Sequence, residues 1–414
     1  EDLEEGNCVS GTLVSGWNSS LPLAIIPVVY DTTDGVEQAG GGKGDDLDAE
    51  LETEECLFAQ PDQDVPLEIA VLENVVRPLL AQREAVEEAA LHLFIRELDI
   101  ASHFQALRSF LLTQQGDLFD VFLPEYLDQA ASASVISSVD AQGIFEDALR
   151  VLGYDRSMKH HGRILFKVHE PVDTDLDDLG LVDCLEVEYQ IGWPLNTVLS
   201  TRSMLAYNII FRYILKHKAL SRRLVDLWTF FKSLQFKVAR DPLIHELELL
   251  RQEMQHFVSI FQGYLMTEVM EVTWSDFLQQ LDDVKDLDGL RLAHETYLNR
   301  ALQRCLLNEK AASLQKVICE VHQSIMMFSA LVDQHAESLQ DRVEVSSLLL
   351  RPERHALQSP LEKCRRNFQE CVRFLLMVLR KLDKRRYKHQ PHVRDLLVRL
   401  DFNGHIFEES DGDR

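Results

Sequence analysis

The sequence predicts an all-α protein, an elongated array of antiparallel helical bundles with one short extended segment near residues 185–191. From residue 66 onward, apolar residues recur at steps of three and four, the spacing that places side chains on one face of an α-helix. Between residues 185 and 191, by contrast, apolar and polar residues alternate, as they do in a half-buried strand. The helical spacing covers most of the chain and therefore decides the fold class.

The first helices are expected between Pro66 and about residue 130. Gly116–Asp117 interrupts the helical pattern, and Pro124 is expected to open a further turn, because proline suits the start of a helix and not its interior. A short helix is predicted at 142–155. Residues 156–183 are mixed in character and end in an acidic stretch, so we expect a loop there that leads into the extended segment.

The second half of the chain has clearer helical signals. Residues 201–237 predict one or two helices. Asp241–Pro242 is a good helix start, since Asp caps free N–H groups and Pro suits the first helical position. From Leu243 to Tyr264, apolar residues follow at alternating spacings of four and three, a packing seam of about six turns. Further helices are predicted at about 288–338, 359–387 and 392–400.

The stretch "GWPLNTVLS", residues 192–200, lies between the extended segment and the first of these helices. Pro194 keeps the residue before it out of the α conformation and fits the first turn of the helix that follows. Trp193 offers a large apolar ring. We interpret the pair as a joint that anchors this change of structure in the core, in preference to a direct contact with a partner.

The charge of the chain is acidic and uneven. The net charge is −26, and residues 1–65 hold 16 Asp and Glu against Lys43 alone. Nucleic acid is therefore not expected as a partner, because neutralising phosphates needs a basic face. Residues 31–65 have almost nothing apolar to bury and are predicted to be a disordered acidic insertion. A spacer is the favoured role, with a docking site for a basic partner as the alternative.

Other classes of protein are disfavoured by what the sequence lacks. It has no run of about 18 apolar residues, so a membrane is not an expected partner. Its seven cysteines are scattered without C-x-x-C spacing, which favours reduced thiols and the cytoplasm. The sequence has no P-loop, G-x-G-x-x-G, G-x-S-x-G or H-E-x-x-H motif. We therefore expect no enzyme, no catalytic residues and no cofactor.

Two local clusters have simpler explanations than a ligand site. His160, His161 and His169 lack zinc-ligand spacing and a fourth ligand, so a solvated loop is favoured over a metal site. The basic run 380–389 suits the end of a helix, where cations complement the helix dipole. Binding of phosphates or of an acidic protein remains open for that run.

Several blocks, taken together, resemble the gamma-tubulin complex protein family. In that family an extended segment precedes Trp-Pro-Leu, a basic residue, a Tyr-x-x-x-Phe-Arg helix and then a Trp one helix later. The matching residues are Trp193, Pro194, Leu195, Arg202, Tyr207, Phe211, Arg212 and Trp228. A second block carries Leu250, Arg251, Met254, Phe257, Tyr264, Glu268, Val269 and Trp274. The closing motif matches Leu400, Asp401, Phe402 and Asn403, so the resemblance covers about 66–403.

The resemblance implies a function as well as a fold. The C-terminal domain of this family binds one gamma-tubulin, and the N-terminal domain contacts neighbouring family members in a ring that templates microtubule nucleation. The chain is then expected to be a non-catalytic scaffold with gamma-tubulin and other family members as partners. GTP would be carried by gamma-tubulin. The implied location is the cytoplasm and cytoskeleton, at the microtubule organising centre, centrosome and spindle. A generic helical adaptor for a different cytoskeletal or coat partner is the alternative.

The resemblance also divides the chain. Residues 1–30 would be the end of a preceding N-terminal domain or a junction, and 31–65 the acidic insertion. Residues 66–192 would begin the C-terminal helical domain, 193–403 would complete it and bind gamma-tubulin, and 404–414 would be a tail. The acidic insertion at this junction makes the chain most similar to the larger members of the family.

The motifs supply candidate residues of two kinds. Partner binding is expected of exposed polar positions, since Arg pairs well with the carboxylates of an acidic tubulin. These candidates are Arg202, Arg212, Arg251, Asp401 and Asn403, and an internal salt bridge is the alternative for each. Packing is expected of the apolar motif positions Trp193, Pro194, Leu195, Tyr207, Phe211, Trp228, Met254, Phe257, Tyr264, Trp274 and Phe402.

Overall fold

The computed structural model of the chain describes residues 66–132, 136–169, 177–235, 242–336, 339, 353–384 and 391–401. The described residues all belong to one unit, Val65–Arg414. The predicted junction at 1–30, the acidic insertion at 31–65 and the tail at 404–414 lie outside the described residues, as do Phe402 and Asn403.

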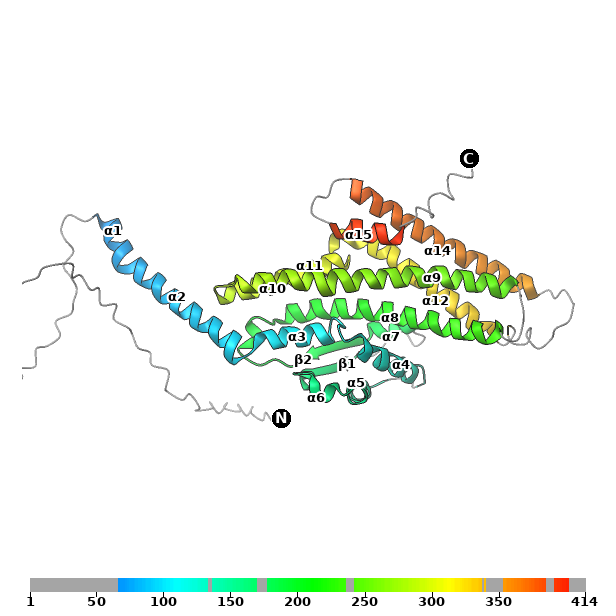
Figure 1. Ribbon diagram of the computed structural model, residues 1–414, viewed down its shortest axis with the longest axis horizontal. Helices are drawn as coiled ribbons and strands as arrows, with labels where there is room; N and C mark the ends of the chain where they lie inside the picture. The colour runs from blue at the N-terminus through cyan, green and yellow to red at the C-terminus, as the bar shows by residue number, and fades with distance from the viewer. Residues whose placement is uncertain are drawn as a thin grey trace, which may run out of the picture. The chain divides into compact units, whose positions relative to one another are not determined.

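The described residues are predominantly helical, as the sequence predicts (Figure 1). The helices before the Trp193–Pro194 joint are α1 (Leu67–Val71), α2 (Arg77–His92), α3 (Ile100–Phe110), α4 (Gly116–Ser132), α5 (Ser138–Leu152), α6 (Tyr154–Ser157) and α7 (Asp178–Asp183). Those after it are α8 (Thr201–Gln235), α9 (Pro242–Leu265), α10 (Thr273–Asp282), α11 (Leu287–Arg304), α12 (Ala312–Gln334), α14 (Glu353–Lys384) and α15 (Pro391–Leu400). π-helical stretches join several of them: η1 (Leu72–Val76), η2 (Leu93–Glu97) and η5 (Met266–Val272). Short 3₁₀ turns are η3 (His161–Arg163), η4 (Leu195–Thr197) and η6 (Glu309–Ala311).

The predicted extended segment is a β-strand, β2 (Leu185–Tyr189), and it pairs antiparallel with β1 (Ile164–Val168). Phe166 lies opposite Val187, and both side chains are buried. Asn208 of α8 fastens the strand to the helix, because its side chain accepts a hydrogen bond from the Val187 N–H and donates one to the Val187 carbonyl, each at 2.8 Å. The strand is thus one of the supports of α8.

Long helices pack as antiparallel neighbours. Tyr213 of α8 is 6.4 Å from Phe261 of α9 between ring centroids, and Ser221 further along α8 bonds to Gln255. The contacts therefore run in opposite directions along the two helices, which lie side by side in Figure 1. The pairs α10–α11 and α12–α14 are also in close contact. One contiguous apolar core joins α3 to α15, as expected for helices with one apolar stripe each.

Three details of the sequence reading need correction. The predicted loop at 156–183 contains α6, β1 and α7, elements too short to give a periodic signal. Pro124 lies inside α4, where its cost of about 3 kcal/mol is offset by buried neighbours such as Phe122 and Tyr126. The predicted helix 288–338 is broken between α11 and α12, where Leu306 has a left-handed φ of 59°.

Among the described residues, every helix is either too short or too polar to cross a lipid bilayer.

Candidate partner-binding surface

At the Trp193–Pro194 joint, the tryptophan side chain is exposed to solvent. The Trp193–Pro194 peptide is cis, and the Pro194 carbonyl accepts hydrogen bonds from the N–H and the hydroxyl of Thr197, at 3.0 and 2.8 Å. Leu195 anchors the turn in the core, while Trp193 is 78% exposed. The joint is therefore present, but the prediction that Trp193 anchors it is wrong. A turn lacks the regular repeat of a helix or strand, so spacing does not settle which of its side chains is buried, and here it is Leu195.

The second motif tryptophan is also on the surface. Trp228 of α8 is 40% exposed, and the ammonium of Lys232 lies 4.7 Å from the centre of its ring. The buried stripe of α8 continues past it through Leu227 and Phe231, and Trp228 lies beside that stripe, which leaves its ring partly in solvent. The remaining described apolar motif residues are buried, with Pro194 half-buried: Leu195, Tyr207, Phe211, Met254, Phe257, Tyr264 and Trp274.

Two of the candidate arginines reach solvent from α8. Arg202 is exposed and Arg212 is half-exposed. Neither guanidinium has a hydrogen bond or an ion pair with the residues that the structure describes. Leu205 and Ile209 lie between them on the same helix, 56% and 43% exposed. These two aliphatic residues were not among the candidates named from the sequence. Their positions on α8 fall outside its buried stripe, so helical spacing could have predicted that they are exposed.

The other candidates lie deeper. Arg251 on α9 is buried, and its Nη2 atom is 3.5 Å from Glu248 Oε1 one helical turn away. The side chain of Asp401 is 3% exposed, and its Oδ2 atom forms an ion pair with Arg380 Nη2 at 2.7 Å. For these two residues the structure shows the internal salt bridge that the sequence reading left as the alternative.

The surface is hollowed on both sides of the exposed part of α8. The α7–α8–α12 hollow has a volume of about 430 Å³ and is lined by Leu179, Asp183, Ile209, Arg212, Cys319 and His322, among others. Two buried polar atoms of its lining, Tyr213 Oη and His322 Nε2, have no hydrogen-bond partner in the described part of the chain. The β2–α8 hollow, of about 710 Å³, is lined by Lys167, Tyr189, Gly192, Met204, Leu205 and Asn208, among others.

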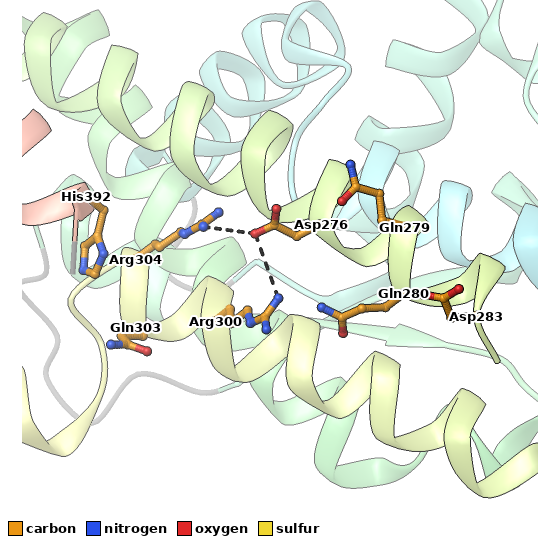
Figure 2. A pocket seen from close by; sticks show the side chains of 8 residues that line it. All are labelled: Asp276, Gln279, Gln280, Asp283, Arg300, Gln303, Arg304 and His392. Atoms are coloured by element: carbon orange, nitrogen blue, oxygen red, sulfur yellow. Dashed lines mark hydrogen bonds and ion pairs between the residues drawn. The ribbon is translucent and has the colours of Figure 1, made fainter. Parts of the chain in front are cut away.

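A third pocket, of about 500 Å³, is wholly polar and is shown in Figure 2. Its side chains come from α10, α11 and α15. Asp276 lies between two arginines, 3.2 Å from Arg304 Nη2 and 3.9 Å from Arg300 Nη1. Burial and the nearby Arg304 lower the pKa of His392 to about 4, so this imidazole is neutral at physiological pH. Because Asp276 pairs with both arginines of the lining, these groups join α10 to α11.

The three loop histidines are held apart by separate partners. His160 Nε2 is hydrogen-bonded to Ser102 Oγ at 2.8 Å, and His161 Nδ1 to the Met158 carbonyl at 2.9 Å. His169 Nε2 lies 2.5 Å from Glu186 Oε2. Within the described ranges, His, Cys, Asp and Glu side chains form no group of three or more that could hold a metal ion.

Comparison with known proteins fits this helical unit and its exposed motif turn. The family model described as gamma tubulin complex component C-terminal matches residues 100–405, from α3 through α15. The chain belongs to the gamma-tubulin complex component family. The family assignment from the sequence motifs is thereby confirmed.

Individual relatives are longer than this chain. Gamma-tubulin complex component 6 of Mus musculus is 29% identical over 355 residues, which are 82% of this chain and 19% of the relative. Component 6 of Homo sapiens is also 29% identical, over 82% of this chain and 18% of its own length. Component 5 of Mus musculus is 25% identical over 74% of this chain and 30% of its own. The chain thus spans about a fifth of the length of the component 6 relatives.

The order of these relatives bears on the acidic insertion. An acidic insertion at 31–65 predicts the sixth component as the most similar member, with the fifth as second choice. Component 6 matches this chain at higher identity and over more residues than component 5 does. The predicted ranking of the two is confirmed.

Proposed function

We propose that this chain is a non-catalytic scaffold that binds gamma-tubulin and helps form the ring complex that templates microtubule nucleation. The observation that carries the proposal is the exposed Trp-Pro-Leu turn. The match to the family's C-terminal region identifies the helical unit, and the tryptophan of this turn is more exposed than the other surface tryptophan of the motifs, 78% against 40% for Trp228. Tryptophan is enriched among the residues that dominate the free energy of protein interfaces, so its exposure favours a partner contact.

The chain contributes shape and contacts, and no chemistry, to this function. We infer that it has no cofactor of its own and that GTP is bound by the gamma-tubulin partner. Other family members are proposed as its lateral neighbours in the ring. The cytoskeleton, at a microtubule organising centre, is the proposed location, with the centrosome and the spindle as the specific sites.

Binding of gamma-tubulin tests the proposal directly. The purified chain is titrated with GTP-loaded gamma-tubulin, and the complex is sized by chromatography with light scattering. We expect a 1:1 complex, and we expect Trp193→Ala to weaken it about 30-fold, or roughly 2 kcal/mol, as for a central interface tryptophan.

Trp228→Ala is the matched control, because it removes the second motif tryptophan that reaches the surface, which is 40% exposed. It should leave the affinity for gamma-tubulin within about threefold of wild type, well under the cost of losing a central interface residue. A well-folded chain that forms no complex with gamma-tubulin would overturn the proposal and favour a general helical adaptor.

A further inference from the structure

One face of α8 carries a short stripe of exposed residues. The α8 stripe consists of Arg202, Leu205, Ile209 and Arg212, which are spaced by 3, 4 and 3 residues. At 3.6 residues per turn, these positions fall within about 80° of one another around the helix. Two aliphatic side chains are thus placed between two guanidinium groups along three turns of one helix, and all four reach solvent.

This part of α8 is basic, in contrast to the net acidic charge of the chain as a whole. Residues 201–223 contain six cations and no Asp or Glu, in a protein with a net charge of −26. Four of the six cations are already engaged. Lys216 pairs with Asp183, Lys218 with Asp120, Arg222 with Asp128 and Asp226, and Arg223 with Asp333.

Arg202 and Arg212 are different, since neither has an ion pair or hydrogen bond among the described residues. An unpaired guanidinium on a net acidic protein creates a local site for carboxylates. Without such a site, the overall negative charge of the chain would repel an acidic partner.

The two hollows beside the α8 stripe support a docking role for it. Leu205 lines the β2–α8 hollow, and Ile209 and Arg212 line the α7–α8–α12 hollow. The stripe therefore forms a ridge with room for partner side chains on both sides. Gly192, the neighbour of exposed Trp193, lines the same hollow as Leu205, so the motif turn and the stripe belong to one continuous surface.

We propose that the α8 stripe binds an acidic segment of gamma-tubulin, an inference that rests on the function proposed above. The segment would carry two carboxylates about 15 Å apart, because ten residues of α-helix separate the two arginines. Apolar side chains lie between the carboxylates and cover Leu205 and Ile209. A helix lying alongside α8 has the same rise per residue and fits this spacing over three turns.

Charge reversal tests the stripe. The full chain carrying Arg202→Glu and Arg212→Glu is titrated with purified gamma-tubulin, beside wild type. We expect the dissociation constant to rise roughly 100-fold, because two charge pairs become repulsive contacts. Leu205→Ser with Ile209→Ser should raise it roughly tenfold, and because both side chains are exposed these substitutions leave the core intact.

The matched control is Lys363→Glu on α14 with Lys285→Glu between α10 and α11. Both lysines are exposed, and the pair changes the net charge by the same amount as the double arginine variant. A change of overall charge alone would weaken both double variants equally, and raised salt would remove that shared effect. We expect the control to bind within about threefold of wild type once this screening is applied.

A cross-linking arm identifies the occupant. A benzophenone amino acid in place of Leu205 is irradiated with gamma-tubulin present, and the product is mapped by mass spectrometry. A cross-link to an acidic segment of gamma-tubulin is the expected result. A cross-link to the chain's own residues 31–65, or unchanged affinity in both stripe variants, would overturn the assignment of the stripe while leaving gamma-tubulin binding intact. Absence of binding by wild type would overturn both proposals.

Discussion

At the scale of single residues, the half-buried Arg304 holds several helices together. Arg304 of α11 donates from Nη1 to the Glu268 carbonyl at 3.1 Å and to Thr273 Oγ1 at 2.7 Å, across the π-helical stretch η5. Its Nη2 atom bonds to Asp276 at 3.2 Å. The Tyr264 hydroxyl donates to the Arg304 carbonyl at 2.7 Å, so both ends of this residue are held. Arg304 therefore joins α9, η5 and α10 to α11.

Replacing Arg304 by Met should destabilise the protein by about 3 kcal/mol, because the Glu268 and Asp276 carboxylates would lose their shared partner. Burial already raises the pKa of Glu268, and loss of Arg304 would raise it further. Urea unfolding monitored by circular dichroism measures the change. Arg300→Met is the control, since Arg300 lies 3.9 Å from the same Asp276 and is more exposed (Figure 2). It should cost at most about 0.5 kcal/mol, and equal losses in both variants would contradict this account.

Residue positions also show how far the sequence reading could go. Buried motif residues such as Phe211 and Met254 follow from helical spacing, because one face of each long helix must meet the core. The exposure of Trp193 does not follow, since the direction of a side chain in a turn depends on three-dimensional packing. Likewise, the ion pair of Asp401 with Arg380 joins α14 to the residue after α15, and no periodicity within one helix reveals it.

At the scale of elements, long helices were predictable and their interruptions were not. The apolar spacing of α11 continues into α12, so one helix was expected across the break. The break depends on local groups instead. Asn308 caps the next turn, since its side-chain oxygen accepts a hydrogen bond from the Ala311 N–H at 3.1 Å. The same limit applies to β1 and α7, which are five and six residues long.

Asn308→Ala should therefore weaken the start of α12 and lower the free energy of unfolding by about 1 kcal/mol. Asn299 offers a matched control, because it is an exposed asparagine in the middle of α11. There the same substitution should stabilise by a few tenths of a kcal/mol, roughly, since Ala has the higher helix propensity. Thermal and urea unfolding of both variants give the comparison. Stabilisation by both substitutions would show that the cap at Asn308 contributes nothing.

At the scale of the whole molecule, the core contains imidazoles that must stay neutral. Burial lowers the pKa of His217 to about 4 and that of His294 to about 3. Burial also lowers the pKa of His322 well below its ordinary value, and His217, 4.6 Å away between ring centroids, lowers it further. These three residues come from α8, α11 and α12, so their state of charge affects packing across the helical unit.

The direction of the pH dependence follows from these shifts. An unfolded histidine binds a proton as pH falls below about 6.5, whereas these three do not until far lower pH in the folded protein. Their contribution to stability is therefore complete above that pH and is lost progressively below it. At pH 5.5 the loss is on the order of 1 kcal/mol for each residue, and so a few kcal/mol, roughly, for the three. That is a large part of the 5 to 15 kcal/mol, roughly, that holds a typical domain folded.

The melting temperature should accordingly fall steeply between pH 7 and pH 5.5, about the range over which unfolded histidine becomes charged. His322→Gln removes one of the buried histidines whose pKa is lowered, a set that also includes His103 and His392, and glutamine keeps polar atoms of similar reach. Its unfolding free energy should be lower than that of wild type at pH 7 but should decline less with acidification, by about 1 kcal/mol at pH 5.5. Urea unfolding of both proteins across this range measures the two slopes. If the unfolding free energies of the two proteins fell in parallel with pH, His322 would already be protonated in the folded protein, or another group would govern the protein's acid sensitivity.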